Sequence, residues 1–273
     1  MSGSTPGSEP SGPSSSVSTT DEERLPGVLP RWEVPGWRDR FGVRAGITGR
    51  GDDPAKPFDL GLWATSPASE VMSRWRQFRA AFPEFTGSVM AHQAHGQRVL
   101  WHRGGPGWTI HDGADGHATS ATGLLLLITV ADCVPIYLVA PARGVVALLH
   151  AGWRGTAAGI LREGLETLHR MAGVEPAELT MHLGVAISGP CYQVGSEVVR
   201  GVGQIPVGKG PWYVDLRDAL AEQGTKLGIG EISRSRRCTA SSPGDFFSHR
   251  ASGGAAGRMV AYLGMPGDTP AAR

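Results

Sequence analysis

The sequence has few cysteines, almost no net charge and no long apolar segment. Its three cysteines in 273 residues, Cys133, Cys191 and Cys238, are an odd and widely spaced set, which excludes a disulfide framework and indicates a reducing compartment. Lysine and arginine number 26 against 25 aspartate and glutamate residues, so the net charge of +1 offers no basic surface for nucleic acid. The longest apolar run, residues 124–131, is far shorter than the roughly 20 residues of a membrane-spanning helix. We therefore expect neither a nucleic-acid nor a membrane partner.

The first 25 residues consist mainly of Ser, Gly, Pro and Thr, with almost no apolar side chains. Such a segment cannot bury enough surface to offset the entropy lost on ordering, so we expect residues 1–25 to form a disordered tail. It also has no basic stretch followed by an apolar one, as a signal peptide would, so we expect a cytoplasmic protein. Residues 26–273 are expected to form one folded domain, because 40% of the chain is hydrophobic.

The centre of the chain carries the clearest fold signal. Residues 124–130, 135–139 and 145–149 are short runs of apolar side chains, which is typical of strands buried on both faces. Residues 156–171 then place leucine and isoleucine at helical spacing, and residues 179–185 return to a strand pattern. This strand, helix, strand order predicts a βαβ unit in a single α/β domain with a mixed sheet.

Other elements are predicted from weaker patterns. We expect further strands at residues 41–47, 88–90, 98–102 and 259–263, and further helices at residues 68–82, 194–202 and 216–227.

Three side chains lie where an apolar run stops and a turn begins: His95, Cys133 and His150. One thiolate and two imidazoles form a ligand set for a soft or borderline metal such as zinc. Three protein ligands leave one tetrahedral position open, which is typical of a catalytic zinc site. His92 is excluded from this set because residues three apart on a strand face opposite sides.

Charged residues flank these positions. Asp132 precedes the cysteine, and it either orients one of the histidines or caps the local turn. Arg154 follows His150 at an expected helix start, where free amides and a guanidinium favour an anion such as phosphate; a surface salt bridge is the alternative. Arg250 offers a second anion contact or lies in a solvated loop.

At these residues the chain resembles the laccase-domain family, also called the polyphenol oxidase-like or purine nucleoside phosphorylase family. The similarity covers roughly residues 38–265 and lies in QAHG at 93–96, TVADCVPIYL at 129–138, LLHAGWRGTAAGIL at 148–161, SGPCYQVG at 188–195, CT at 238–239 and FFSHR at 246–250.

The resemblance implies a zinc enzyme with His95, Cys133 and His150 as the metal ligands. It implies phosphorolysis of adenosine, inosine, guanosine and methylthioadenosine, with adenosine deaminase activity in addition. We expect Cys133, His150 and Asp132 to take part in catalysis. The implied fold is a mixed-sheet α/β sandwich with flanking helices, related to deamidase toxins that use a Cys–His pair. The oligomeric state is left open.

Three segments differ from the pattern of the family. Arg50-Gly51-Asp52-Asp53 replaces Gly-Gly-Val-Ser, Asp59-Leu60-Gly61 replaces Asn-Leu-Gly, and His249-Arg250-Ala251 replaces Tyr-Arg-Arg. Because these positions are candidates for the pocket lining, they bear on substrate preference more than on metal binding.

Three other functions fit parts of the pattern. A metal-free hydrolase would use Cys133 as nucleophile and His150 as base, with an amide in peptidoglycan precursors as substrate. A copper-dependent polyphenol oxidase needs many paired histidines, and the nine histidines here are not spaced that way, although one Cys and two His could hold copper. A binding module without activity is the third.

Overall fold

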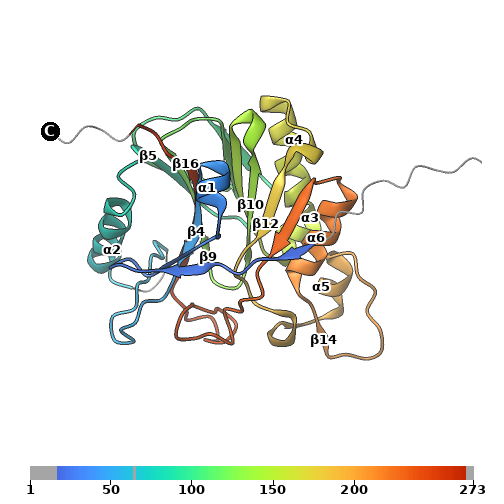
Figure 1. Ribbon diagram of the computed structural model, residues 1–273. Helices are drawn as coiled ribbons and strands as arrows, with labels where there is room; N and C mark the ends of the chain where they lie inside the picture. The colour runs from blue at the N-terminus through green and yellow to red at the C-terminus, as the bar shows by residue number, and fades with distance from the viewer. Residues whose placement is uncertain (1–16, 64–65, 269–273) are drawn as a thin grey trace, which may run out of the picture.

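The computed structural model describes residues 17–63 and 66–268, and this part of the chain folds into two seven-stranded mixed sheets flanked by helices (Figure 1). In spatial order, sheet A contains β1 (Ser18–Thr19), β15 (Glu231–Arg234), β12 (Thr180–Leu183), β10 (Val134–Ala140), β11 (Val145–Ala151), β8 (Gly116–Thr119) and β6 (Val99–His102). Sheet B contains β2 (Glu23–Leu25), β3 (Arg31–Glu33), β4 (Arg44–Thr48), β16 (Met259–Met265), β9 (Leu124–Val130), β5 (Gly87–His92) and β7 (Gly107–Asp112). A small sheet pairs β13 (Gln193–Val194) with β14 (Trp212–Tyr213).

The helices cover the outer faces of the two sheets (Figure 1). On sheet B lies α2 (Ala68–Ala80), and on sheet A lie α4 (Ile160–Ala172) and α6 (Leu216–Lys226). The remaining helices are α1 (Trp37–Phe41), α3 (Trp153–Ala158) and α5 (Ser196–Gly201). None of the helices in the described ranges has the length and apolar content needed to cross a bilayer.

Alternating side chains of the central strands fill three separate cores. In β9, Leu126 and Ile128 pack between the two sheets, whereas Leu125 and Leu127 pack under α2. In β11, Val146 and Leu148 face the space between the sheets, and Ala147 and Leu149 face α4. Both faces of these strands are therefore buried, which explains their unbroken apolar sequence and confirms that expectation.

The predicted βαβ unit is present with one strand inserted. Strands β11 and β12 are both antiparallel to β10, so they run parallel to each other on either side of it. The connection between them carries two helices where one was expected at residues 156–171. Gly159, at φ 88°, ends α3 and begins α4, because this left-handed conformation breaks the helix.

Residues near the N-terminus differ from the expected tail. Residues 1–16 lie outside the described part of the chain, but Ser18–Thr19 forms β1 beside β15, and Glu23–Leu25 forms β2 beside β3. Tertiary contacts therefore order a segment whose own composition is poor in apolar residues: the buried Glu22 carboxylate lies 3.1 Å from His182 and accepts from the amide of Val185.

A second difference lies at residues 41–47, where one strand was expected. Gly42 ends α1 in the left-handed conformation, and β4 begins only at Arg44. Strand β7 was not predicted at all, because it is an edge strand with mostly exposed side chains and so lacks an apolar run.

The buried His117 and the half-buried His102 predict a loss of stability in mild acid. His102 Nε2 lies 2.9 Å from His117 Nδ1. Burial is the larger cause and repulsion from neighbouring histidines the smaller one, and together they lower the pKa of His102 to about 4 and that of His117 to about 3. The unfolded chain protonates histidine near pH 6.5, so stability is full above that pH and falls as the pH drops toward the folded-state values. Between about pH 6.5 and 4.5, protonation of His117 in the unfolded chain should by itself lower the free energy of unfolding by about 2 kcal/mol.

Urea unfolding of metal-free protein across this pH range measures the effect. The free energy of unfolding should depend less steeply on pH in His117→Gln than in the wild type. His169→Gln is the control and should keep the wild-type dependence, because the His169 side chain is 64% exposed. An equal slope in the wild type and His117→Gln would contradict the prediction.

Candidate metal centre

The three candidate ligands come from different strands and meet at one site. His95 lies in the turn after β5, Cys133 lies between β9 and β10, and His150 is near the end of β11. Their ligand atoms all lie within 4.8 Å of one another, and the two imidazole centroids are 4.9 Å apart in an edge-on arrangement. The expected convergence of these side chains is therefore present in the fold. His92, at the end of β5, is not one of the trio, but it lines the same cavity as His95 and so does not face the opposite side, because the chain turns between the two residues.

The backbone around the ligands is held in an uncommon conformation. His95 and Asp132, the residue before Cys133, have φ values of 57° and 91°, the positive range that side chains other than glycine rarely adopt. Such strain persists where surrounding contacts compensate for it. Each turn is held by hydrogen bonds to a carboxylate, and the two carboxylates are Asp115 and Asp132 itself.

Asp115 is the site residue that the sequence analysis missed. Its buried carboxylate accepts hydrogen bonds from the amides of Ala94, His95 and Gly96 at 3.2, 2.9 and 2.8 Å. It also lies 2.9 Å from His150 Nδ1, which leaves the other ring nitrogen, Nε2, for a metal. One carboxylate thus shapes the turn of one ligand and orients the ring of another. The only local signal is its place in a glycine-flanked turn just before β8.

Asp132 does not orient a histidine, which was one of the two roles considered for it. Its carboxylate accepts from Thr239 Oγ1 at 2.5 Å and from the amide of Arg250 at 2.7 Å. It therefore holds the segment that carries Arg250 against the turn after β9, whereas Asp115 is the carboxylate that contacts and orients His150.

The ligand atoms form a charged cluster. Burial alone would raise the pKa of the Cys133 thiol, but the charge of His150 and hydrogen bonds from His150 and His95 outweigh burial and lower the pKa to about 6. Burial would likewise lower the pKa of His150, but the thiolate charge and the Asp115 hydrogen bond raise it to about 9. Cys133 is therefore a thiolate at neutral pH, the form that binds metals and acts as a nucleophile.

These residues fit a divalent metal ion. Ligand bonds of about 2.0–2.3 Å place two ligand atoms of a tetrahedral ion about 3.3–3.8 Å apart, so ligand atoms within 4.8 Å of one another need side-chain shifts of about 1 Å. A β-carbon on Gly152 would lie 3.1 Å from Cys133 Sγ, so a glycine keeps the space beside the sulfur clear. Among the described residues, His95, Cys133 and His150 form the one group of three His, Cys, Asp or Glu side chains that lie close enough together to share an ion.

Two cavities adjoin the ligands. We call the first the tryptophan cavity; it has about 350 Å³ and is lined by the three ligands together with Trp63, His92, Gln93 and Arg258 among others. We call the second the arginine cavity; it has about 230 Å³ and is lined by His95, Cys133, Trp153, Arg154, Tyr192 and Arg250 among others. His95, Ala131, Cys133 and His249 line both.

The arginine cavity brings together the two candidate anion-binding residues. The guanidinium of Arg154 lies 4.5 Å from the ring centroid of Trp153, and that of Arg250 lies 4.8 Å from that of Tyr192. Arg250 Nη1 also donates to the carbonyl of Gln193. These aromatic contacts hold two positive charges beside Cys133 without neutralising them.

Comparisons with known proteins agree with this geometry. Residues 40–266 match the sequence model of the family described as multi-copper polyphenol oxidoreductase laccase. The chain belongs to this family. A curated relative, the purine nucleoside phosphorylase YlmD of Geobacillus stearothermophilus, is 34% identical over 82% of this chain and 90% of its own length. A second, the purine nucleoside phosphorylase YlmD of Bacillus subtilis, is 31% identical over 82% of this chain and 88% of its own length.

Solved structures show the same fold. The crystal structure of YlmD from G. stearothermophilus superposes with a TM-score of 0.77 at 29% identity, over 89% of this chain and 98% of that chain. The Bacillus licheniformis hypothetical protein YfiH superposes with a TM-score of 0.79 at 27% identity, over 87% and 97% of the two chains. The family resemblance and the mixed α/β fold are thus confirmed. The expected relation to deamidase toxins stays a prediction.

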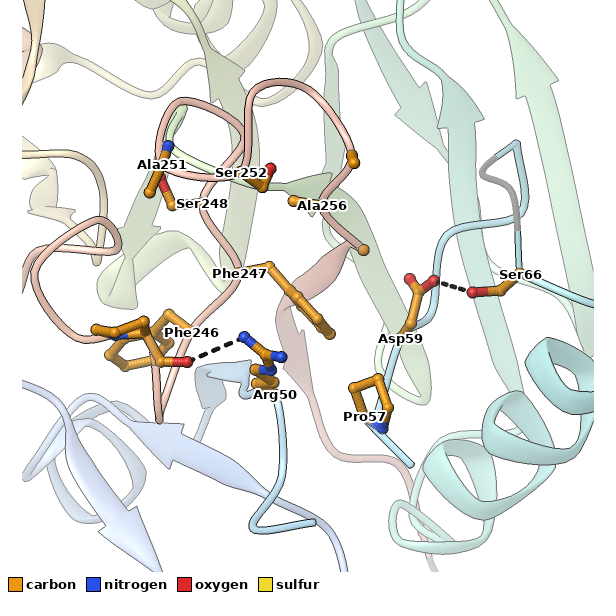
Figure 2. A pocket seen from close by; sticks show the side chains of 13 residues that line it. Arg50, Pro57, Asp59, Ser66, Phe246, Phe247, Ser248, Ala251, Ser252 and Ala256 are labelled. Carbon is orange, nitrogen blue, oxygen red and sulfur yellow. Dashed lines mark hydrogen bonds between the residues drawn. The ribbon is translucent and has the colours of Figure 1, made fainter. Parts of the chain in front are cut away.

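Four of the departures from the family pattern line cavities, whereas Asp52 is exposed and pairs with Arg24. Arg50, Asp59 and Ala251 line a third cavity of about 400 Å³ (Figure 2). Arg50 donates to the carbonyl of Pro243, and Asp59 accepts from Ser66 Oγ at 2.7 Å. The last departure, His249, lines both cavities that contain the ligands.

Proposed function

We propose that the protein is a zinc-dependent purine nucleoside phosphorylase. The observation that carries the proposal is the convergence of His95, Cys133 and His150 beside a cavity that holds Arg154 and Arg250. The naming of the relatives as purine nucleoside phosphorylases supports purine nucleosides and phosphate as substrates. Adenosine, inosine, guanosine and methylthioadenosine are the proposed substrates, and adenosine deamination is a proposed second activity.

Each residue has a defined part in this proposal. Zinc, held by the thiolate and two imidazoles, supplies positive charge that stabilises a developing negative charge. Arg154 and Arg250 bind the attacking phosphate, because two guanidinium groups match the charge and shape of a phosphate. Asp115 holds His150 in one orientation, and Asp132 acts through its hydrogen bond to the Arg250 backbone. A cytoplasmic location fits the three free cysteines.

Turnover with and without metal tests the proposal. Purified protein supplied with adenosine and inorganic phosphate should form adenine and ribose 1-phosphate. A chelator should abolish the reaction, and added zinc should restore it, because the trio supplies a metal site with an open position. Elemental analysis of the protein as purified distinguishes zinc from copper. No turnover by fully zinc-loaded protein would contradict the proposal.

A Cys–His hydrolase is the second candidate, because one observation favours it. Cys133, His150 and Asp115 form a thiolate, imidazole and carboxylate series like that of cysteine hydrolases. The proposed substrate of this version is an amide bond in peptidoglycan precursors. Such an enzyme would keep its activity in the presence of a chelator, so the same chelation experiment separates the two candidates.

A copper-dependent polyphenol oxidase is less well supported. In the described part of the chain the structure brings together one group of three possible ligands, whereas a multicopper centre needs several. Oxygen uptake with a phenolic substrate after copper loading would revive this alternative.

A further inference from the structure

An aromatic side chain at the mouth of the tryptophan cavity is not explained by folding. Trp63 is 51% exposed, although the described chain buries most of its large aromatic residues. Its ring lies 4.8 Å from that of His92, at an angle of 41°. The backbone just before it is fixed, because Leu60 is fully buried and its carbonyl accepts from Trp75 Nε1 at 3.0 Å. Trp63 is thus presented beside the metal ligands while much of its surface stays exposed.

The polar side chains in this cavity are largely committed to the protein itself. Gln93 Nε2 donates to the carbonyl of Thr129 at 3.0 Å, and Gln93 Oε1 accepts from the amide and hydroxyl of the same residue at 2.8 and 2.6 Å. Arg258 Nη1 donates to the carbonyls of Ala256 and Gly257 at 2.6 and 3.1 Å. Beside the imidazoles and the thiol of the candidate metal site, the cavity therefore offers a ligand the exposed ring of Trp63, which favours a flat ring that binds by stacking.

The arginine cavity differs in charge, since the guanidinium groups of Arg154 and Arg250 both line it, whereas Arg258 is the arginine that lines the tryptophan cavity. A ligand with a flat apolar end would therefore bind in the tryptophan cavity, and an anionic co-substrate would bind in the arginine cavity. His95, Cys133 and His249 would lie where the two meet.

We propose that the purine base of the substrate stacks on Trp63 in the tryptophan cavity, while phosphate binds at Arg154 and Arg250 in the arginine cavity. This inference rests on the proposed function for the identity of the ligand. It assigns Trp63 as a substrate-binding residue that sets the affinity for the nucleoside and leaves the affinity for phosphate unchanged. The bond to be cleaved then lies above Cys133, between the two cavities.

Steady-state kinetics of Trp63→Ala tests this assignment. Loss of base stacking should raise KM for the nucleoside about tenfold or more, because stacking on an aromatic residue has an effect of this size. KM for phosphate and the zinc content should not change. Trp63→Phe should recover most of the loss, since it restores an aromatic face. Tyr213→Ala is the matched control, because Tyr213 is 52% exposed and lies outside both cavities.

The outcomes separate this inference from the proposed function. If the wild type is active and Trp63→Ala leaves KM for the nucleoside unchanged, or raises both KM values equally, the base site is wrong. Calorimetric titration with inosine in the absence of phosphate provides a readout independent of turnover. If inosine binds the wild type, binds Trp63→Ala more weakly and is not phosphorolysed, the base site stands and the proposed reaction fails.

Discussion

Cys133→Ala is expected to abolish nucleoside phosphorolysis and to release the metal. The variant removes the thiolate and leaves two imidazoles, which hold zinc far more weakly than the complete set. Because a bound metal ion contributes several kcal/mol to catalysis, and 1.36 kcal/mol is tenfold in rate, the rate should fall by about a thousandfold or more. Elemental analysis should show the loss of zinc in parallel with the loss of turnover.

Cys191→Ala is the matched control for this variant. It removes a free cysteine that is not one of the trio, so zinc content and turnover should both stay near wild-type values. A zinc-replete and active Cys133→Ala protein would remove the basis of the proposed metal centre. A zinc-replete but inactive one would instead favour Cys133 as a nucleophile.

Asp115→Asn is expected to weaken both the metal site and the fold. Asn keeps the shape but loses the charge, and it replaces one acceptor oxygen with a donor that faces backbone amides. Outer carboxylates that orient ligand histidines typically contribute 10–100-fold to metal affinity, and we expect a loss of about that size. Breaking the buried contact with His150 should lower the free energy of unfolding by about 3 kcal/mol.

Zinc affinity is measured by competition with a chelator, and stability by urea unfolding of metal-free protein, because bound metal itself adds stability. Asp112→Asn is the control: that carboxylate lies three residues away with a side chain that is 91% exposed. It should change stability by less than about 0.5 kcal/mol. Equal effects of the two variants would show that Asp115 does not hold the site together.

Local sequence patterns predicted much of the central fold. The apolar runs of β9, β10 and β11 are readable because these strands are buried on both faces, so every residue along them is selected for burial. Patterns failed where burial is one-sided or absent. The edge strand β7 is mostly exposed, β1 is ordered by pairing with β15 far along the chain, and the short β2 is ordered by pairing with the neighbouring β3.

The identities of the possible metal ligands were predictable for a related reason. A cysteine or histidine at or just after the end of a buried strand lies where the sheet stops, so its side chain can face a cavity. The carboxylate that supports them was not predictable. Asp115 is 20 residues from His95 and 35 from His150, and nothing in its own neighbourhood marks it as their partner.

The amino-acid sequence by itself therefore determined which strands are buried and which donor atoms are available, since both follow from short-range patterns of polarity. The tertiary structure alone decided that Asp115 rather than Asp132 orients a ligand, and that Trp63 lines one cavity beside the trio while Arg154 and Arg250 line another. The physical reason is that strand pairing and sheet packing bring together residues that are far apart in the chain. Short-range sequence patterns do not indicate which distant residues will meet.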